Sequence, residues 1–409
     1  MRVGRGMRGI VASVVVAGAW AVLVAAGGAA MARAHAPADD PRAGAGGIPA
    51  SPVAASPAGA AAALPPIRHV FILVLENQSF STTFGKPSPA PYLANTLVSK
   101  GALLTHYYGI GHWSLDNYLA LISGQAPNSE TQADCPALTE FQLSQPKLDA
   151  NGQALGKGCI YPAMVKTVAD QLEAAKLTWK GYMEDMGNDL KRERATCGHS
   201  PLGQDERTGR ATVSDKYAAK HDPFVYFHSI LDDQNRCDAH VVNLDKLPAD
   251  LRKVDTTPNY SFITPNLCND GHDASCIDGK LGGYPAIDAF LQKWVPLIVN
   301  SPAYKQDGLL IITFDESDSK AEDAATDCCG EQGLPGEPQL PGVIGPGGGR
   351  IGAVLLSQFI KPATVSAVHY NHYSTLRYVE DQFGLEHLGY AGQKGLQIFG
   401  SDVFTQPAP

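Results

Sequence analysis

Two continuous hydrophobic segments, far apart in the chain, constrain the fold more than any other feature. Residues 69–75 read HVFILVL and stop at Glu76-Asn77, and residues 309–314 read LLIITF and stop at Asp315-Glu316. Continuous rather than alternating hydrophobicity predicts strands covered on both faces, as in a parallel sheet flanked by helices. Ligands of such sheets bind at the carboxyl ends of the strands, where these acidic and amide side chains would lie.

Helical patterns alternate with further strand-like segments along the chain. The expected helices are 161–177 and 287–298, and the expected additional strands are 179–182, 260–264 and 351–356. This alternation predicts an α/β fold, a three-layer α/β/α sandwich with a mainly parallel central sheet.

The N-terminal region predicts export. Three arginines are followed by an uncharged run from Gly9 to Ala30 and by Ala34-His35-Ala36, which indicates a signal peptide over residues 1–36. An uncleaved membrane anchor is the alternative, because the run is long enough to span a bilayer. Residues 37–66 are rich in Ala, Pro, Gly and Ser and predict a disordered linker. We therefore expect one domain over residues 67–409, secreted, periplasmic or at the cell surface.

The eight cysteines of an exported chain predict disulfide bonds. Structural zinc is not favoured, because no C-x2-C pair occurs. The pairing cannot be read from the sequence, although Cys268 with Cys276 is the most local bridge available. The adjacent Cys328 and Cys329 are expected to bond to different partners. The net charge of −9 argues against nucleic acid as a partner.

Residues 114–123 predict a helix with Ser114 at the N-cap and Gly124 just past the end. Capping alone would explain this serine. However, a helix N-terminus also presents N–H groups to an anion, so the serine is placed to meet a phosphate. A serine needs a base or a metal ion to become nucleophilic. A lipase-type triad is not supported, because no G-x-S-x-G motif surrounds Ser114.

Four motifs occur in order along the chain, and together they carry a resemblance. They are Glu76-Asn77-Gln78-Ser79-Phe80, His112-Trp113-Ser114 with Asn117-Tyr118, Asn269-Asp270-Gly271-His272-Asp273, and Phe314-Asp315-Glu316. From about residue 67 to residue 390 the chain resembles the bacterial phosphoesterase family that contains secreted acid phosphatases and phospholipases C, which is related to the alkaline phosphatase superfamily. The resemblance implies an alkaline-phosphatase-like sandwich.

The resemblance also implies a ligand set for one divalent metal ion. Its members are Glu76, Asn77, Asp315 and Glu316, with Ser114 completing the shell and attacking phosphorus. These oxygen donors suit Ca²⁺, Mg²⁺ or Mn²⁺, although zinc also accepts carboxylates. Gln78 and Trp113 stand where the family often has Arg and Pro, so the pocket wall is expected to differ.

The expected chemistry is attack by Ser114, a phosphoseryl intermediate and its hydrolysis. His272 and His372 are the further catalytic candidates, and His112, Asn117 and Asp273 are the substrate-binding candidates. The resemblance supports Asn117 and His272 best. A solvated loop histidine is the alternative for His272, and a surface histidine is the alternative for His372.

The leading functional expectation is an acid phosphatase that acts on small phosphate esters, or on phospholipid or phosphoinositide headgroups with transient membrane contact. The closest alternative is a phospholipase C, and a sulfatase is a lesser one. The alternative outside enzymology is a non-catalytic, disulfide-stapled surface binding protein. The oligomeric state cannot be read from the sequence.

Overall fold

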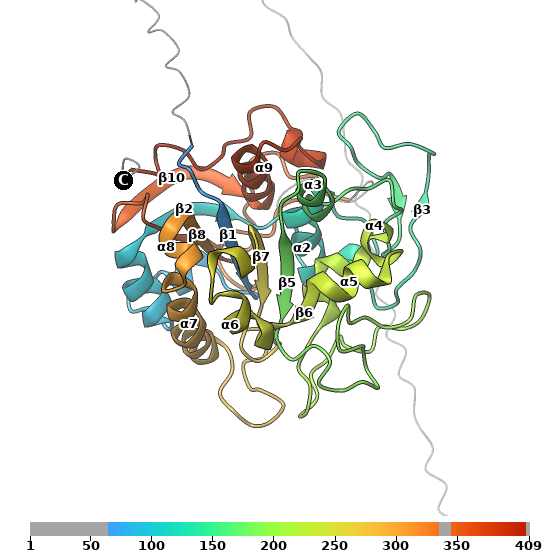
Figure 1. Ribbon diagram of the computed structural model, residues 1–409, viewed down its shortest axis with the longest axis horizontal. Helices are drawn as coiled ribbons and strands as arrows, with labels where there is room; N and C mark the ends of the chain where they lie inside the picture. Colours follow the sequence, from blue (N-terminus) through green and yellow to red (C-terminus); the bar gives the residue numbers. More distant parts are fainter. Residues whose placement is uncertain (1–63, 335–344, 406–409) are drawn as a thin grey trace, which may run out of the picture. The chain divides into compact units, whose positions relative to one another are not determined.

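The computed structural model describes residues 64–334 and 345–405. The predicted signal peptide and nearly all of the predicted linker lie outside these residues. The described chain forms an eight-stranded sheet with the order β10-β2-β9-β8-β1-β7-β5-β6 (Figure 1). The strands are β1 (His69–Leu75), β2 (Ala102–Tyr108), β5 (Trp179–Met183), β6 (Val241–Asn243), β7 (Tyr260–Thr264), β8 (Gly308–Phe314), β9 (Ala353–Ser357) and β10 (Thr364–Asn371). All neighbouring pairs are parallel except those of β9 with β8 and β2.

Helices cover both faces of this sheet. On one side lie α7 (Tyr284–Val299), which contacts β8, and α8 (Pro302–Asp307), which contacts β8 and β1. On the other side lie α2 (Ser114–Ser123), α3 (Val168–Ala174) and α9 (His372–Phe383), which contact one another (Figure 1). The remaining α-helices of the described chain are α1 (Phe80–Thr83), α4 (His228–Leu231), α5 (Gln234–His240) and α6 (Leu247–Asp250). The predicted three-layer α/β/α architecture with a mainly parallel sheet is therefore confirmed.

The two hydrophobic segments form the centre of the sheet. Every residue of β1 and of β8 is buried, and the strands pair in register from His69 with Gly308 to Leu75 with Phe314. Burying one large aliphatic side chain stabilises a fold by roughly 1.5–3 kcal/mol, so this pair forms a strong framework. Because the register is fixed, Glu76 and Asp315 must emerge side by side.

The helix expected over residues 161–177 is much shorter in the structure. Only Val168–Ala174 is helical, and it begins at Thr167 in a capping box with Asp170. At the start of the segment Tyr161 instead forms an isolated bridge, since its backbone bonds to Tyr226 and His228, and the next residues form a turn closed by the Val165 N–H and the Pro162 carbonyl. Tertiary hydrogen bonds thus override the helical spacing at the start of this segment.

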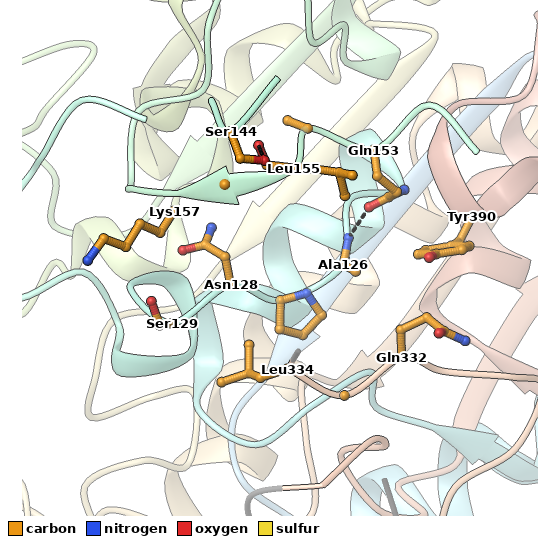
Figure 2. Close-up of a pocket in the computed structure, with 14 residues that line it drawn as sticks. Ala126, Asn128, Ser129, Ser144, Gln153, Leu155, Lys157, Gln332, Leu334 and Tyr390 are labelled. Carbon is orange, nitrogen blue, oxygen red and sulfur yellow. Dashed lines mark hydrogen bonds between the residues drawn. The ribbon is translucent and has the colours of Figure 1, made fainter. Parts of the chain in front are cut away.

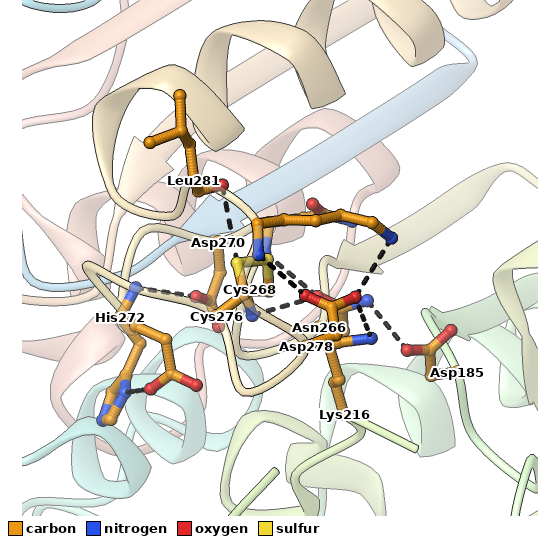
Figure 3. Close-up of a disulfide and its surroundings, with 12 residues drawn as sticks. Asp185, Lys216, Asn266, Cys268, Asp270, His272, Cys276, Asp278 and Leu281 are labelled. Atoms are coloured by element: carbon orange, nitrogen blue, oxygen red, sulfur yellow. Dashed lines mark hydrogen bonds and ion pairs between the residues drawn. A yellow bond between two sulfur atoms is a disulfide. The ribbon is translucent and has the colours of Figure 1, made fainter. Parts of the chain in front are cut away.

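Four disulfides are present among the described residues. They are Cys135–Cys159, Cys197–Cys237, Cys268–Cys276 and Cys328–Cys329. The Cys268–Cys276 bridge closes the loop that follows β7 (Figure 3). The expectation that Cys328 and Cys329 bond to different partners was wrong. The other six cysteines pair among themselves, which leaves these neighbours, with Cα atoms 3.7 Å apart, to bond to each other.

A cavity of about 630 Å³ lies beside the short hairpin of β3 (Gln142–Leu143) and β4 (Gly156–Lys157), next to Gln332–Leu334 (Figure 2). Lys157 and Tyr390 are the ionisable residues that line it, and none of the predicted site residues does. No helix in the described part of the chain has the length and hydropathy needed to cross a membrane. The chemistry-bearing residues gather elsewhere, at the carboxyl edge of the sheet.

Candidate active site

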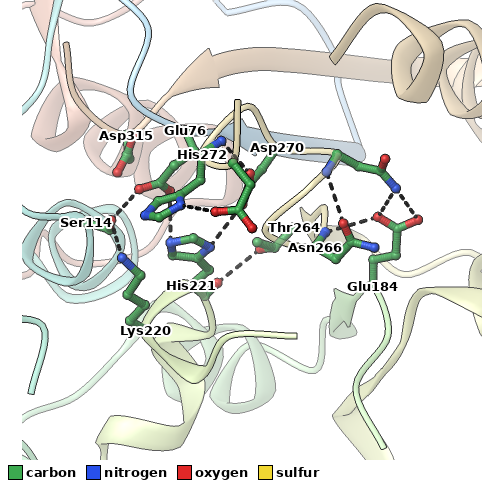
Figure 4. Close-up of polar contacts among 12 residues, drawn as sticks. Glu76, Ser114, Glu184, Lys220, His221, Thr264, Asn266, Asp270, His272 and Asp315 are labelled. Atoms are coloured by element: carbon green, nitrogen blue, oxygen red, sulfur yellow. Dashed lines mark hydrogen bonds and ion pairs between the residues drawn. The ribbon is translucent and has the colours of Figure 1, made fainter. Parts of the chain in front are cut away.

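Three adjacent parallel strands deliver four carboxylates to one place. Glu76 follows β1, Asp315 and Glu316 follow β8, and Asp270 lies in the loop after β7. The backbone joins these strand ends, because the Glu76 N–H donates to the Asp270 carbonyl at 2.9 Å and the Asp315 N–H donates to the Leu75 carbonyl at 2.9 Å. All four acids are buried. Figure 4 shows several of them around Ser114.

Glu76, Asp315 and Glu316 form a compact oxygen cluster, with one oxygen from each within 4.8 Å of the others. Asn77 joins it, donating from its backbone N–H to Asp315 Oδ1 at 2.9 Å and from its amide to Glu76 Oε1 at 3.0 Å. Burial raises the pKa of Asp315 well above its usual range, and the charges of Glu76 and Glu316 raise it further. Asp315 Oδ2 has no hydrogen-bond partner among the described residues. Buried like charges with an orphaned oxygen are the features of a cation site.

Ser114 is the first residue of α2, and its hydroxyl faces this cluster. The expected N-cap position was wrong by one residue: Trp113 is the N-cap, and its side chain makes no capping hydrogen bond. Ser114 Oγ donates to Glu76 Oε1 and lies 3.3 Å from Lys220 Nζ. Its hydroxyl is therefore committed to polar side chains of the site and not to the helix backbone.

Trp113 holds the backbone that aims this hydroxyl. Its φ of 78° and ψ of 141° lie in a region that non-glycine residues rarely adopt. The Trp113 N–H donates to Glu316 Oε2 at 3.0 Å, which ties the turn before Ser114 to the carboxylate cluster. Strain of this kind persists where surrounding contacts hold it in place.

Two buried cationic side chains, which the sequence analysis did not identify, complete the site. Lys220 and His221 lie on a 3₁₀ turn over Ala219–His221, between β5 and β6. His221 Nε2 lies 2.9 Å from Glu76 Oε2, and its Nδ1 lies 3.3 Å from Asp270 Oδ2. Burial lowers the pKa of His221, but Glu76 and Asp270 outweigh it and raise the pKa to about 9. The only signal in the sequence is a Lys-His-Asp triplet between the apolar stretches YAA and PFVYF.

His272 lies beside Glu76 and near His221, as Figure 4 shows. Its ring Nδ1 lies 2.9 Å from Asp273 Oδ1, and its backbone N–H donates to Asp270 Oδ1 at 2.8 Å. Burial lowers the pKa of His272, yet Asp273 and Glu76 reverse this, so the pKa is raised overall. Asp273 thus orients the imidazole and leaves Nε2 for a substrate.

The sequence matches the model of the phosphoesterase family over residues 86–386 of its 409. The chain belongs to this family. The matched region contains Ser114, Lys220, His272, Asp315 and Glu316, and it begins after Glu76.

Curated relatives of this phosphoesterase include a probable acid phosphatase from Kluyveromyces lactis, 24% identical over 333 residues, which cover 79% of this chain and 59% of the relative. A phosphatidylinositol-3-phosphatase from Mycobacterium tuberculosis is 27% identical over 333 residues, or 81% of this chain and 82% of the relative. The chain thus spans about three fifths of the length of the yeast relative. A solved protein of the alkaline phosphatase superfamily from Vibrio parahaemolyticus has a TM-score of 0.48 at 13% identity, covering 85% of this chain and 72% of that one.

Asn117 in this phosphoesterase fixes the loop that precedes the serine. Its Oδ1 accepts from the N–H groups of Ile110 at 2.6 Å and Gly111 at 3.3 Å, and its Nδ2 donates to the carbonyls of Gly111 at 2.9 Å and Trp113 at 3.0 Å. The side chain is fully buried. Its amide is fully engaged by the loop, which does not support the predicted contact with substrate. As placed, Asn117 is a positioning residue for Ser114.

His112 orients Glu316. Its Nδ1 lies 2.6 Å from Glu316 Oε2, and its Nε2 donates to the Ala324 carbonyl at 3.0 Å. Burial lowers the pKa of His112, but Glu316 raises it above its ordinary value overall. The ring lines a cavity of about 260 Å³ with Asn77, Trp113, Glu316 and Ser319, yet both nitrogens are occupied. Direct phosphate binding by His112 is therefore not supported.

His372 contacts the backbone of Asp315 and not its carboxylate. Its Nε2 donates to the Asp315 carbonyl at 2.6 Å, and its Nδ1 lies 3.2 Å from the Tyr107 hydroxyl, from which it accepts. Burial lowers the pKa of His372 to about 4, so the ring is neutral at physiological pH. The structure therefore does not support the catalytic role predicted for His372. The ring supports the backbone of a candidate metal ligand.

Proposed function

We propose that this protein is a metal-dependent phosphomonoesterase of the acid phosphatase kind that forms a phosphoseryl intermediate on Ser114. The observation that carries the proposal is the position of Ser114 Oγ, hydrogen-bonded to Glu76 at the margin of a buried cluster of three carboxylates. The named relatives support phosphate monoesters, including phosphoinositide headgroups, as the substrate class. The proposal also includes export of the protein, which is based on the signal peptide predicted over residues 1–36.

The donor set fits a divalent metal ion. Glu76, Asn77, Asp315 and Glu316 supply oxygens, and the unpaired Asp315 Oδ2 lies within the same cluster. Oxygen donors of this kind suit Ca²⁺, Mg²⁺ or Mn²⁺, and zinc also accepts them. When bound, the ion would lower the pKa of the Ser114 hydroxyl and draw charge from the phosphoryl oxygens.

The reaction then follows from the side chains of the site. Ser114 Oγ loses its proton to solvent and bonds to phosphorus, while the bond from phosphorus to the ester oxygen breaks. The departing alcohol oxygen takes a proton from His272 Nε2, whose partner Asp273 favours the charged ring. A water molecule next attacks phosphorus and returns a proton to His272. Oγ regains its proton as inorganic phosphate leaves, so one water is consumed per ester.

The test compares Ser114→Ala with Ser123→Ala, which removes a buried hydroxyl at the other end of α2. Protein stripped with a chelator is reloaded with each metal ion and assayed on an aryl phosphate and on phosphatidylcholine. We expect metal-dependent release of inorganic phosphate, an acid-stable phosphoserine, and a loss of at least about a thousandfold in kcat for Ser114→Ala alone. Phosphocholine as the product would indicate the phospholipase C alternative. Full activity of Ser114→Ala would refute the assignment of the nucleophile.

A further inference from the structure

Lys220 is a buried cation in direct contact with the hydroxyl of Ser114. Its Nζ lies 3.3 Å from Ser114 Oγ and 3.0 Å from Asp134 Oδ2, and the residue is only 8% exposed. Among the described residues, it is the one lysine or arginine that contacts Ser114 or the carboxylates around it. Figure 4 shows the side chain extending from its turn toward Ser114.

The surroundings of Lys220 fix the ammonium at that position. Asp134 accepts from Lys220 Nζ with Oδ2 and from the Leu115 N–H with Oδ1 at 3.0 Å, so one carboxylate holds both the cation and the first turn of α2. Asp134 is also the neighbour of Cys135, whose disulfide with Cys159 closes this segment. Asp134 therefore fixes the ammonium relative to Ser114 through these two hydrogen bonds, and the disulfide holds the segment that carries Asp134.

An ion pair between Lys220 and Asp134 is the structural alternative. Taking an ammonium out of water costs several kcal/mol, and a partner carboxylate offsets this cost. Asp134 is half-buried, so a lysine could pair with it nearer the surface. The ion pair alone does not explain why the ammonium also contacts the serine hydroxyl.

The direction of the hydrogen bond indicates a chemical role. An ammonium has three donors and no acceptor, so Lys220 donates to a lone pair of Oγ. The hydroxyl hydrogen of Ser114 is directed to Glu76 at the same time. A donor to Oγ favours the alkoxide over the alcohol. Once Oγ bonds to phosphorus, the non-bridging oxygens lie next to Oγ and within reach of the same ammonium.

We propose that Lys220 is a catalytic residue whose ammonium stabilises the Ser114 alkoxide and then binds a non-bridging oxygen of the transferred phosphoryl group. Lys220 remains protonated throughout and takes no proton from the serine. A fixed positive charge at this place offsets the repulsion that the carboxylates exert on an incoming phosphate. The proposal rests on Ser114 being the nucleophile of the proposed function.

The experiment measures the rate of phosphoserine formation by rapid acid quench in the metal-loaded enzyme, with an aryl phosphate in excess. Lys220→Met removes the charge and keeps most of the length of the side chain. Lys220→Arg keeps the charge. Lys216→Met is the matched control, because Lys216 lies four residues earlier and pairs with Asp278 at 3.3 Å, outside this cluster (Figure 3).

We expect Lys220→Met to slow phosphoserine formation by about 10²–10³-fold, as the removal of one preorganised donor does elsewhere. Lys220→Arg should recover part of this rate, and Lys216→Met should remain within about threefold of the wild type, because its ion pair with Asp278 lies outside the cluster around Ser114. Thermal unfolding of each variant separates this effect from loss of folded protein. If Lys220→Met does not fold, the rate of phosphoserine formation is measured in Lys220→Gln instead. This variant is expected to fold, because its amide can still donate to Asp134.

The outcomes separate this inference from the function on which it rests. A wild-type rate in the folded Lys220→Met or Lys220→Gln variant, with a lowered melting temperature, would show that Lys220 serves only the ion pair. Ser114→Ala, measured in parallel, would still be inactive in that case. Activity in Ser114→Ala would instead overturn the nucleophile and the role of Lys220 together.

Discussion

Replacing Asp315 by asparagine should stabilise the metal-free protein while it abolishes activity. Burial and the charges of Glu76 and Glu316 raise the pKa of Asp315, so the folded state binds a proton there more tightly than the unfolded state does. A raised carboxyl pKa means that stability falls as the pH rises from the ordinary value through the raised one. An asparagine is never charged and can reproduce the protonated acid, with Oδ1 still accepting from the Asn77 N–H.

The expected gain follows from the geometry of the cluster. Two unit charges at the 4.8 Å limit of the cluster repel by about 3.5 kcal/mol at an effective dielectric constant of about 20. Because the wild type can relieve part of this repulsion by binding a proton at Asp315, we expect Asp315→Asn to be more stable than the wild type by about 1–3 kcal/mol at pH 8. The difference should shrink as the pH falls through the raised pKa of Asp315, because the wild-type side chain then becomes protonated too.

Urea unfolding in the presence of a chelator at pH 5 and pH 8 measures this difference. When the chelator is replaced by a metal ion at a hundredfold excess over its dissociation constant, the wild type should be stabilised by about 2.7 kcal/mol and the variant far less. The order of stability should then reverse. Asp323→Asn is the control, since Asp323 is a buried aspartate whose partner Arg350 lies at 3.0 Å. That variant should be destabilised at both pH values. A chelated Asp315→Asn protein less stable than the wild type at pH 8 would refute the reasoning.

Three further results are expected. His372→Phe should lower the free energy of unfolding by about 1–3 kcal/mol, because the Asp315 carbonyl loses its donor. Since the pKa of His372 is about 4, the pH–rate profile above pH 5 should keep its shape, and the loss of an ionisation step from that part of the profile would contradict this assignment. His272→Gln should slow hydrolysis of alkyl phosphates by about 10²–10⁴-fold and of aryl phosphates less, because only a poor leaving group needs the acid, and equal losses in kcat/KM would argue against that role. Replacing both Cys135 and Cys159 by alanine should cost about 3 kcal/mol in urea unfolding for a bridge that spans 24 residues, and unchanged stability would show that local contacts suffice.

The framework of the site could be predicted because it depends on local sequence. The hydrophobic segments 69–75 and 308–314 are buried on both faces and form neighbouring parallel strands, so the acids that follow them meet at one edge. The clustering of Glu76, Asp315 and Glu316 is a direct consequence of that register. Ser114 was assigned to the correct helix end, although the cap is Trp113.

The roles of single polar side chains were harder to predict, because they depend on burial and on long-range partners. Asn117 and His372 lie close to the reacting groups, but backbone groups occupy their hydrogen-bonding atoms. Lys220 and His221 belong to no motif, and contacts with Ser114 and Glu76, more than a hundred positions earlier, give them their place. A single sequence carries the residue types but not these pairings.

The residues of the site lie on two kinds of structural element, strand ends and loops, and this arrangement has a chemical consequence. The oxygen donors Glu76, Asp315 and Glu316 follow the buried central strands, which suits a metal site that must hold its geometry. Lys220 and His272 lie outside these strands, on a turn and on a disulfide-closed loop respectively. Ser114 Oγ contacts both sides, through Glu76 and through Lys220. In the proposed attack the hydroxyl gives up its proton while an anion approaches, so Ser114 at this boundary would be supported by the strand ends before bond formation and by Lys220 during it.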